Sequence, residues 1–287
     1  MKILVIGGTG RLGEPVVRRL VADGHEARVL TRSREIAAER FGGLCEVVAG
    51  DVEDRAAVDR ALVGCDAVYL SLDGHGDWDL ERRGAELVAA AAKEAGLERI
   101  GTISGASVCE ENTWFPMTRA KFLAERAIRE SGVPYTIFRC TMFMELLPSL
   151  VRGDKALVMG EQVHPWRFLA AADYARMVSK ALALPAAANR TLLIVGPEAL
   201  TMEQALRTYR RLCAPDAELR HVPFFVLRLL SLFPGRRELR RVGLPIMRYF
   251  SKVHEIGSPD EANDLLGAPT TTVDQWCRSR RAFAHAA

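Results

Sequence analysis

The chain has 287 residues and a formal net charge of +3, with 49% hydrophobic and 26% charged residues. This composition is ordinary for a soluble globular protein, and the length is enough for one large α/β domain or for a core with a smaller lobe. Six scattered cysteines, with no Cys-x-x-Cys pair and no clustered histidines, argue against a disulfide framework or a zinc site. They favour a cytoplasmic protein with reduced thiols.

The chain begins with an apolar strand that leads straight into a glycine-rich turn. Residues 2–13 read KILVIGGTGRLG, so we expect neither a signal nor a transit peptide. The first spaced glycine permits a tight turn, the second lets backbone approach a pyrophosphate, and the third lets the next helix pack close to the sheet. N–H groups that open a helix favour negative charge. We therefore expect a diphosphate-binding loop formed by Gly7, Thr9, Gly10, Arg11, Leu12 and Gly13.

The first half of the chain alternates strands and helices, as a doubly wound α/β fold with a parallel sheet does. We expect strands at residues 2–6, 26–30, 46–49, 67–71, 99–104 and 135–139. We expect helices at about 11–22, 34–41, 55–62, 80–95 and 116–131. Right-handed crossovers then give the strand order 3-2-1-4-5-6, with a ligand crevice at the carboxyl ends of the strands.

The pattern changes after Arg139. Residues 140–167 predict a loop-rich excursion over the crevice, and 173–184 and 191–195 predict a further helix and strand. The letters TMEQ at 201–204 resemble a helix cap that opens a mainly helical section. We predict a core of residues 1–139 plus about 168–196, and a smaller helical substrate lobe of about 140–167 and 197–287 that forms one compact unit with it.

The C-terminal section is basic. Residues 201–287 hold fourteen Lys and Arg against nine Asp and Glu, with the densest cluster at Arg236, Arg237, Arg240 and Arg241. A solvated helix face accounts for such a cluster; a membrane surface, an acidic substrate or nucleic acid has no supporting motif, and we expect no nucleic-acid partner. The apolar stretch 222–233 is too short to cross a bilayer. It is typical of a lid or core helix, and the nearby arginines leave an interfacial anchor open.

The end of the second strand indicates which nucleotide the crevice takes. A fold that prefers NAD carries an acidic residue there, whereas this chain reads TRSR at 31–34. Arg32 can pair bidentately with a 2′-phosphate, and Arg11 is near enough to help; a solvent-facing loop arginine is the alternative for Arg32. Asp51 and Val52 follow the third strand, where a carboxylate can accept from adenine, although Asp51 could equally cap a helix. The sequence predicts NADP as the cofactor.

Six segments carry a family resemblance. They read GGTGRLG at 7–13, RVLTRS at 28–33, GDV at 50–52, ISGAS at 103–107, AKFLAERAIRESGVPYTIFR at 120–139 and TMFME at 141–145. In this order and spacing they resemble the atypical short-chain dehydrogenase/reductases, within them the NmrA-like and isoflavone-reductase-like branch. The resemblance extends from Met1 to about Gly196 and implies an NAD(P)-binding Rossmann core. It is specific for the superfamily and not for a substrate.

The resemblance also marks a departure. Better-known members of the superfamily place Tyr-x-x-x-Lys on the fifth helix, and residues four apart share a helix face. Here Lys121 stands at the lysine position, but the residue four before it is Met117, whose thioether cannot donate a proton. The resemblance implies that Lys121 binds the nicotinamide ribose and helps proton transfer. An ordinary solvated lysine is the alternative.

Two serines end strands at the predicted crevice. Ser104 lies where short-chain reductases place a hydroxyl, so Ser104 and Lys121 are the catalytic candidates. Ser71 ends the fourth strand and is a cofactor-binding candidate. Either serine could simply terminate its strand.

Residues beyond the sixth strand complete the predicted site. Thr141 and Phe143 are expected beside the nicotinamide. His75 and His164, each in a loop, are open between a ligand contact and a structural role. The apolar substrate crevice is expected to be lined by Trp114, Met117, Phe143 and Met144.

The leading functional hypothesis is an NADP(H)-dependent oxidoreductase that transfers hydride to an apolar acceptor such as a quinone, an enone or an aromatic natural product. Such a transfer needs a held nicotinamide and an oriented acceptor, and water or Lys121 can supply the proton. The alternative is a non-catalytic NADP(H)-sensing regulator of NmrA-like type, and a third hypothesis is a structural or assembly role. A homo-oligomer is compatible with each.

Overall fold

The computed structural model describes residues 1–74, 76–161, 164–233 and 235–286, and the chain divides into two compact units. Unit 1 comprises Met1–Cys140, Ala171–Ile194 and Gly257–Gly267. Unit 2 comprises Thr141–Ala170, Val195–Ile256 and Ala268–Ala287.

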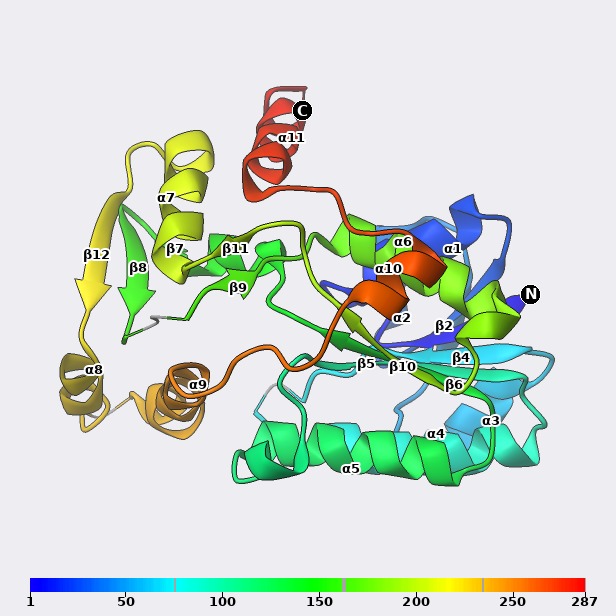
Figure 1. Ribbon diagram of the computed structural model, residues 1–287. Coiled ribbons are helices and arrows are strands. Elements are labelled where there is room, and N and C mark those ends of the chain that lie inside the picture. Colours follow the sequence, from blue (N-terminus) through cyan, green and yellow to red (C-terminus); the bar gives the residue numbers. More distant parts are fainter. Residues whose placement is uncertain (75, 162–163, 234, 287) are drawn as a thin grey trace. The chain divides into compact units, whose positions relative to one another are not determined.

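Unit 1 is built on a seven-stranded parallel sheet (Figure 1). The strand order is β10-β6-β5-β4-β1-β2-β3, which confirms the predicted order 3-2-1-4-5-6 and places β10 beside β6. The strands are β1 (Lys2–Ile6), β2 (Glu26–Thr31), β3 (Glu46–Ala49), β4 (Ala67–Leu70), β5 (Arg99–Gly105), β6 (Tyr135–Cys140) and β10 (Arg190–Ile194).

Helices cover both faces of this sheet (Figure 1). They are α1 (Gly13–Ala22), α2 (Arg34–Phe41), α3 (Arg55–Leu62), α4 (Leu80–Glu94), α5 (Pro116–Glu130), α6 (Ala171–Ala183) and α10 (Asp260–Leu266). The helices α3, α4 and α5 run along one face, and α1 packs against α6 on the other. Single 3₁₀ turns occur at Glu110–Asn112 and Pro185–Ala187.

Side-chain caps fix where several of the helices begin. Ser33 accepts a hydrogen bond from the N–H of Ile36 at the start of α2, and Asp54 accepts from the N–H groups of Ala56 and Ala57 at the start of α3. The predicted start of α1 at residue 11 is wrong by two residues, because Arg11 lies in the turn and α1 begins at Gly13.

One hydrophobic core cluster of unit 1 lies between the sheet and helices α3, α4 and α5. It joins the apolar strand residues of β1 and β4, such as Leu4, Ile6 and Val68, to the alanine-rich face of α4. The opposite face holds a polar contact, where the hydroxyls of Tyr69 on β4 and Tyr174 on α6 lie 2.6 Å apart. Burial raises the pKa of both phenols, so this buried pair stays protonated and structural.

Unit 2 contains two small sheets. One has the order β12-β8-β7 and the other pairs β11 with β9. Its strands are β7 (Val151–Arg152), β8 (Lys155–Met159), β9 (Trp166–Arg167), β11 (Ala199–Leu200) and β12 (Glu218–Val222). The expectation of a loop-rich segment at 140–167 was therefore wrong, because β8 finds a parallel partner in β12, about sixty residues further along the chain.

The helices of unit 2 are α7 (Met202–Cys213), α8 (Phe224–Leu230), α9 (Leu244–Phe250) and α11 (Val273–Ala286), with a 3₁₀ segment at Met144–Leu150 and a π-helical turn at Leu239–Gly243. Thr201 and Gln204 form the capping box predicted at the start of α7. The apolar stretch at 222–233 is not a core helix, because Leu227 is buried while Phe225, Leu229 and Leu232 are exposed. Among the described residues, no helix is long and apolar enough to cross a membrane.

Candidate functional site

The turn between β1 and α1 brings backbone closer to backbone than a side chain permits. Gly7 has φ of 84°, and a Cβ there would lie 2.1 Å from the carbonyl oxygen of Ser71. A Cβ at Gly13 would lie 2.1 Å from the carbonyl oxygen of Gly7. The N–H of Gly10 donates to that same oxygen at 3.0 Å and closes the turn. The first and third glycines therefore serve the turn and the helix packing, as the sequence predicts.

An open cleft lies over this turn, at the carboxyl ends of β1 to β4. Its volume is about 930 Å³, including space open to solvent. Within the described residues, Arg11, Leu12 and Gly13 lie outside its lining. Seven predicted cofactor residues line it: Gly7, Thr9, Gly10, Arg32, Asp51, Val52 and Ser71.

A cation stands at the cleft end of β2. Arg32 has a side chain that is 76% exposed, and its Nε lies 3.9 Å from Oδ2 of Asp51. Asp51 accepts a hydrogen bond from the N–H of Glu53 at 3.0 Å, so its carboxylate shapes the loop after β3. Asp54, and not Asp51, caps the following helix. A turn in which Gly7 and Gly13 leave no room for a side chain, together with a guanidinium just after β2, could hold a phosphorylated dinucleotide.

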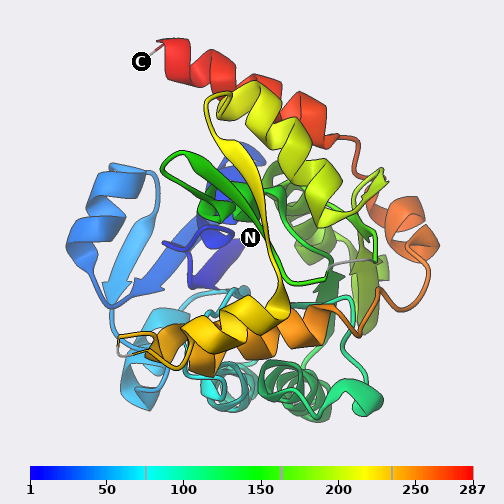
Figure 2. The same ribbon diagram turned by 90° about the vertical axis from the view of Figure 1, so that its left-hand side faces the viewer.

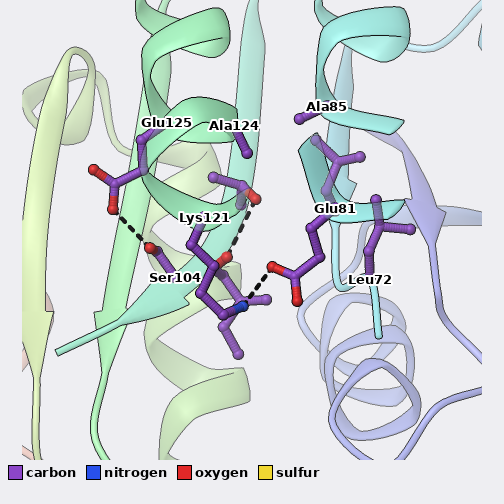
Figure 3. Close-up of a pocket in the computed structure, with 10 residues that line it drawn as sticks. Leu72, Glu81, Ala85, Ser104, Lys121, Ala124 and Glu125 are labelled. Atoms are coloured by element: carbon purple, nitrogen blue, oxygen red, sulfur yellow. Dashed lines mark hydrogen bonds and ion pairs between the residues drawn. The ribbon is translucent and has the colours of Figure 1, made fainter. Parts of the chain in front are cut away.

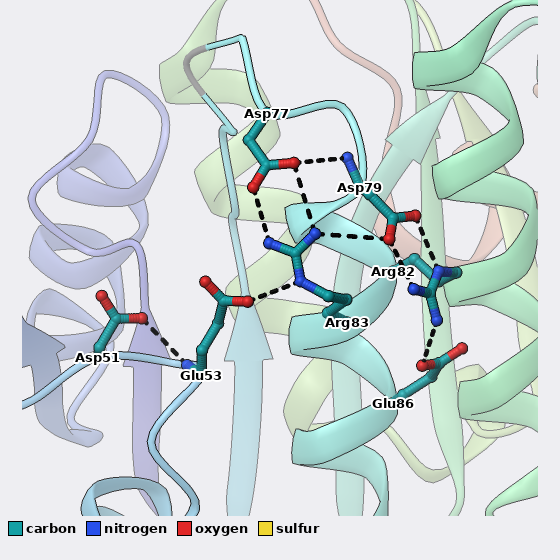
Figure 4. Close-up of polar contacts among 7 residues, drawn as sticks. All are labelled: Asp51, Glu53, Asp77, Asp79, Arg82, Arg83 and Glu86. Carbon is teal, nitrogen blue, oxygen red and sulfur yellow. Dashed lines mark hydrogen bonds and ion pairs between the residues drawn. The ribbon is translucent and has the colours of Figure 1, made fainter.

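A second arginine connects two loops of the cleft (Figure 4). Arg83 on α4 pairs with Glu53 in the loop after β3 at 2.6 Å and with Asp77 in the loop after β4 at 2.7 Å. Both carboxylates belong to residues that line the cleft. The hydrogen bond from Arg83, and then that from the N–H of Asp79, lower the pKa of Asp77. The neighbouring Arg82 pairs with Asp79 and Glu86 of its own helical segment.

Lys121 lies in a smaller cavity between α4, α5 and the ends of β4 and β5 (Figure 3). Its Nζ lies 2.5 Å from Oε2 of Glu81, and the two side chains are 15% and 17% exposed. Glu81 comes from the first turn of α4, so the pair joins neighbouring helices. Lys121 is therefore held in place by a carboxylate and is not a freely solvated lysine.

Ser104 lines the same cavity but belongs to a buried ionic network. Its Oγ donates to Oε1 of Glu125 at 2.6 Å (Figure 3). The Glu125 carboxylate also accepts from Arg139 and Arg129 at 2.7 and 2.8 Å. Burial alone would raise the pKa of Glu125, but the hydrogen bonds and charge of Arg139, with those of Ser104 and Arg129, lower it. Ser104 thus has a structural partner at the position where a catalytic hydroxyl was expected.

The residue one helical turn before Lys121 cannot donate a proton. Met117 occupies the first turn of α5, one turn before Lys121, and is partly buried. In the described part of unit 1, neither the open cleft nor the Lys121 cavity has a tyrosine in its lining. The local chemistry is an ammonium–carboxylate pair beside a dinucleotide-sized cleft.

The remaining predicted residues divide between the units. In unit 2, Thr141 donates to Glu255 at 2.5 Å, and Glu255 also pairs with Arg167 at 2.6 Å. Phe143 forms a β-bridge with Leu169.

The expected apolar crevice also draws on both units. Met144 in unit 2 is fully buried, and Trp114 in unit 1 is half exposed. A common crevice formed by Trp114, Met117, Phe143 and Met144 stays a prediction. His164 is partly buried, and His75 lies outside the described residues.

Sequence reasoning missed three ionic residues that organise these sites, namely Glu81, Arg83 and Glu255. The acidic residue in the first turn of α4 was a usable signal for Glu81, because α4 and α5 are neighbours in the predicted topology. No local pattern marks the other two.

Comparisons with known proteins place the chain among relatives of several activities. The profile of the NmrA-like family matches residues 1–265. A (4-alkanoyl-5-oxo-2,5-dihydrofuran-3-yl)methyl phosphate reductase of Streptomyces griseus is 36% identical over 217 residues, covering 74% of each chain. The photosystem II assembly factor Ycf39 of Trieres chinensis is 27% identical, covering 82% of this chain and 76% of that protein. The structure of the Citrobacter triphenylmethane reductase with NADP(H) superposes with a TM-score of 0.77 at 20% identity, covering 97% and 99% of the two chains.

Proposed function

The chain belongs to the NmrA-like family, and from this premise we propose that it is an NADPH-dependent reductase acting on a conjugated, apolar acceptor such as a quinone, an enone or an aromatic natural product. The observation that carries the proposal is the pairing of two sites in unit 1. One is the cleft lined by the glycine-rich turn and Arg32, and the other is the cavity that holds Lys121. The first suits a phosphorylated dinucleotide, and the second offers a proton source.

Different residues of the cleft would bind different parts of NADPH. Backbone N–H groups of the Gly7–Gly13 turn would hold the diphosphate, and the Arg32 guanidinium would pair with the 2′-phosphate. β2 ends at Thr31, and Arg32-Ser33-Arg34 follow it without a carboxylate that would repel that phosphate. Asp51 and Val52 would contact the adenine end. NADPH, when bound, supplies the hydride.

Lys121 would supply the proton. Reduction of a carbon–carbon double bond conjugated to a carbonyl adds hydride to one carbon, and the resulting enolate takes one proton. The Nζ of Lys121 carries that proton, and Glu81 holds the ammonium in place at 2.5 Å. A tyrosine is not required for this chemistry, because the enolate is a weaker base than the alkoxide formed from an isolated ketone. Met117 is therefore compatible with the reaction.

The similarity to the Streptomyces reductase supports a conjugated acceptor. Its name describes a 5-oxo-2,5-dihydrofuran, a ring in which a double bond is conjugated to a carbonyl group. The acceptor of the present chain is accordingly proposed as an activated double bond or a quinone, both of which accept hydride at carbon or oxygen without prior protonation.

The direct test is the loss of NADPH absorbance when purified protein is mixed with a panel of quinones and enones, with simple ketones as the control set. We expect turnover with conjugated acceptors and none with isolated ketones. Lys121→Met should lower kcat by about 100-fold while the affinity for NADPH changes much less. Tight NADPH binding without turnover of any acceptor would overturn the proposal.

A second candidate, a non-catalytic NADP(H)-sensing or assembly protein, is favoured by Met117 at the tyrosine position and by the similarity to an assembly factor. This role predicts partner capture that differs between NADP and NADPH and persists in Lys121→Met. Capture that is independent of the cofactor would eliminate it.

A further inference from the structure

A stripe of exposed apolar side chains lies on α8 and the turn that follows it. Five of the eleven large hydrophobic side chains exposed in the described residues fall within positions 225–233. Phe225, Leu229 and Leu232 are spaced four and three apart, so they share one face of the helical segment. Phe225 is 71% and Leu232 is 68% exposed. Leu227, on the opposite face, is buried and anchors α8 in unit 2.

The same part of the chain is rich in unpaired arginine. Residues 224–252 hold seven Lys and Arg and a single acidic residue, Glu238. Elsewhere arginines are commonly paired, as Arg83 is with two loop carboxylates. By contrast, in the described residues there is no ion pair to the guanidinium of any of these arginines: Arg228, Arg236, Arg237, Arg240, Arg241 and Arg248.

The apolar stripe and the arginines adjoin one another. Helices α8 and α9 contact each other, and the two views place them side by side within unit 2 (Figures 1 and 2). Arg228 lies within the stripe itself, between Phe225 and Leu229 in the sequence, and is exposed. Exposed apolar groups next to positive charges are the features of a surface that lies in the interface of a membrane.

We propose that this basic–apolar surface docks on the anionic face of a lipid bilayer, with α8 lying in the plane of the interface. An RNA would satisfy the arginines but would leave Leu229 and Leu232 without an apolar partner, and so would a protein surface that is merely acidic. A lipid interface satisfies both, since acyl chains take the apolar stripe and anionic headgroups take the guanidinium groups. The surface is defined by Phe225, Arg228, Leu229, Leu232, Phe233, Arg236, Arg237 and Arg240.

The expected contributions of the basic and apolar residues to membrane affinity are large enough to measure. Each basic residue near an anionic leaflet strengthens binding about fivefold, and burying one Leu or Phe side chain strengthens it roughly tenfold. The charge contribution is screened by salt, because the Debye length shortens to a few ångströms at high ionic strength. Docking should therefore depend on anionic lipid, on salt and on the apolar stripe at the same time.

The experiment is co-sedimentation of the full chain with vesicles of phosphatidylcholine alone and with vesicles that also contain phosphatidylglycerol. We expect binding only to the anionic vesicles, weakened by salt. The double variants Phe225→Ser/Leu229→Ser and Arg236→Gln/Arg237→Gln should each lower the partition at least tenfold. All four side chains are exposed, so these changes leave the fold intact.

A matched control removes the same charge elsewhere. Arg60 on α3 and Arg126 on α5 are exposed arginines of unit 1, and Arg60→Gln/Arg126→Gln should bind the vesicles as the unmodified chain does. Equal loss in this control, equal binding to both kinds of vesicle, or no vesicle binding would overturn the proposal. So would a preference for an RNA oligonucleotide over anionic vesicles. NADPH titration of the same samples reports on the cleft separately, so a failure here leaves the proposed function untouched.

Discussion

Lys121 and Glu81 form an ion pair of 2.5 Å that joins α5 to α4 beside the dinucleotide-sized cleft. Because both side chains are largely shielded from water, removal of one partner leaves the other without its counter-charge. A double-mutant cycle with Glu81→Gln and Lys121→Met should therefore give a coupling energy of about 1 kcal/mol in the free energy of unfolding. Urea unfolding of the four proteins measures it. Strictly additive effects would mean that the two side chains do not interact in solution.

Arg32 should select the phosphorylated cofactor. Replacement by glutamate removes a bidentate partner of the 2′-phosphate and introduces repulsion, so Arg32→Glu should weaken NADPH binding at least 100-fold more than NADH binding. Fluorescence titration with both cofactors gives the ratio. Arg60→Glu serves as the control, because it makes the same change of charge at an exposed arginine outside the cleft lining; the ratio of the two affinities should stay as it is. If Arg32→Glu weakened both cofactors equally, Arg32 would not read the phosphate.

Gly7 and Gly24 provide a matched pair for the turn. Both have φ near 85°, but no atom lies within 4 Å of a Cβ built at Gly24, whereas one built at Gly7 would meet the carbonyl of Ser71. Gly24→Ala should lower the free energy of unfolding by about 1 kcal/mol, because alanine disfavours the left-handed backbone conformation. Its NADPH affinity should be unchanged. Gly7→Ala should lower the thermal unfolding midpoint further than Gly24→Ala does, and it should abolish NADPH binding. Unchanged NADPH affinity in a folded Gly7→Ala protein would contradict the proposal that the turn between β1 and α1 binds the cofactor.

Arg83 should hold the cleft loops in position while Arg82 does not. Arg83→Met frees the loops that carry Glu53 and Asp77, and these exposed pairs are each worth at most about 1 kcal/mol. The affinity for NADPH should fall roughly threefold to tenfold, with kcat at saturating cofactor unchanged. The control Arg82→Met removes pairs within one helical segment and should leave the affinity as it is. Calorimetric titration distinguishes the two variants.

Glu125 should make the fold sensitive to acid. Its pKa is lowered in the folded state, so its contribution to stability is present above its unfolded pKa of about 4.3 and is lost as the pH falls through the folded value. Glu125→Gln should cost about 3 kcal/mol at neutral pH, because it leaves Arg139 and Arg129 without their buried counter-charge.

The difference in the free energy of unfolding between Glu125→Gln and the unmodified chain should shrink as the pH falls below about 4. Urea unfolding across this range follows it. Glu130→Gln, on the exposed side of the same helix, is the control and should change little at any pH. Parallel loss of stability in the Glu125 variant and the unmodified chain would contradict the prediction.

The sequence predicted the sheet of unit 1 because its order follows from local periodicity and from the handedness of crossovers. Gly7, Arg32 and Asp51 could be placed at one cleft for the same reason, since the carboxyl ends of parallel strands share an edge. The β8–β12 pairing could not be predicted, because each strand is short and its partner is distant in the chain. The pairing of Arg83 with Glu53 and Asp77 depends on side-chain reach between loops, which sequence spacing does not encode.

The hydroxyl of Ser104 carries one hydrogen, and the carboxylate of Glu125 already takes it. What this oxygen can still offer to the neighbouring cavity is a lone pair. A ligand group that approaches Ser104 must therefore supply an N–H or O–H. The Ser104 hydroxyl accordingly favours ligands that carry a hydrogen-bond donor at this position. Carbonyl oxygens and other electron-rich atoms are turned away from Ser104 and toward the ammonium of Lys121.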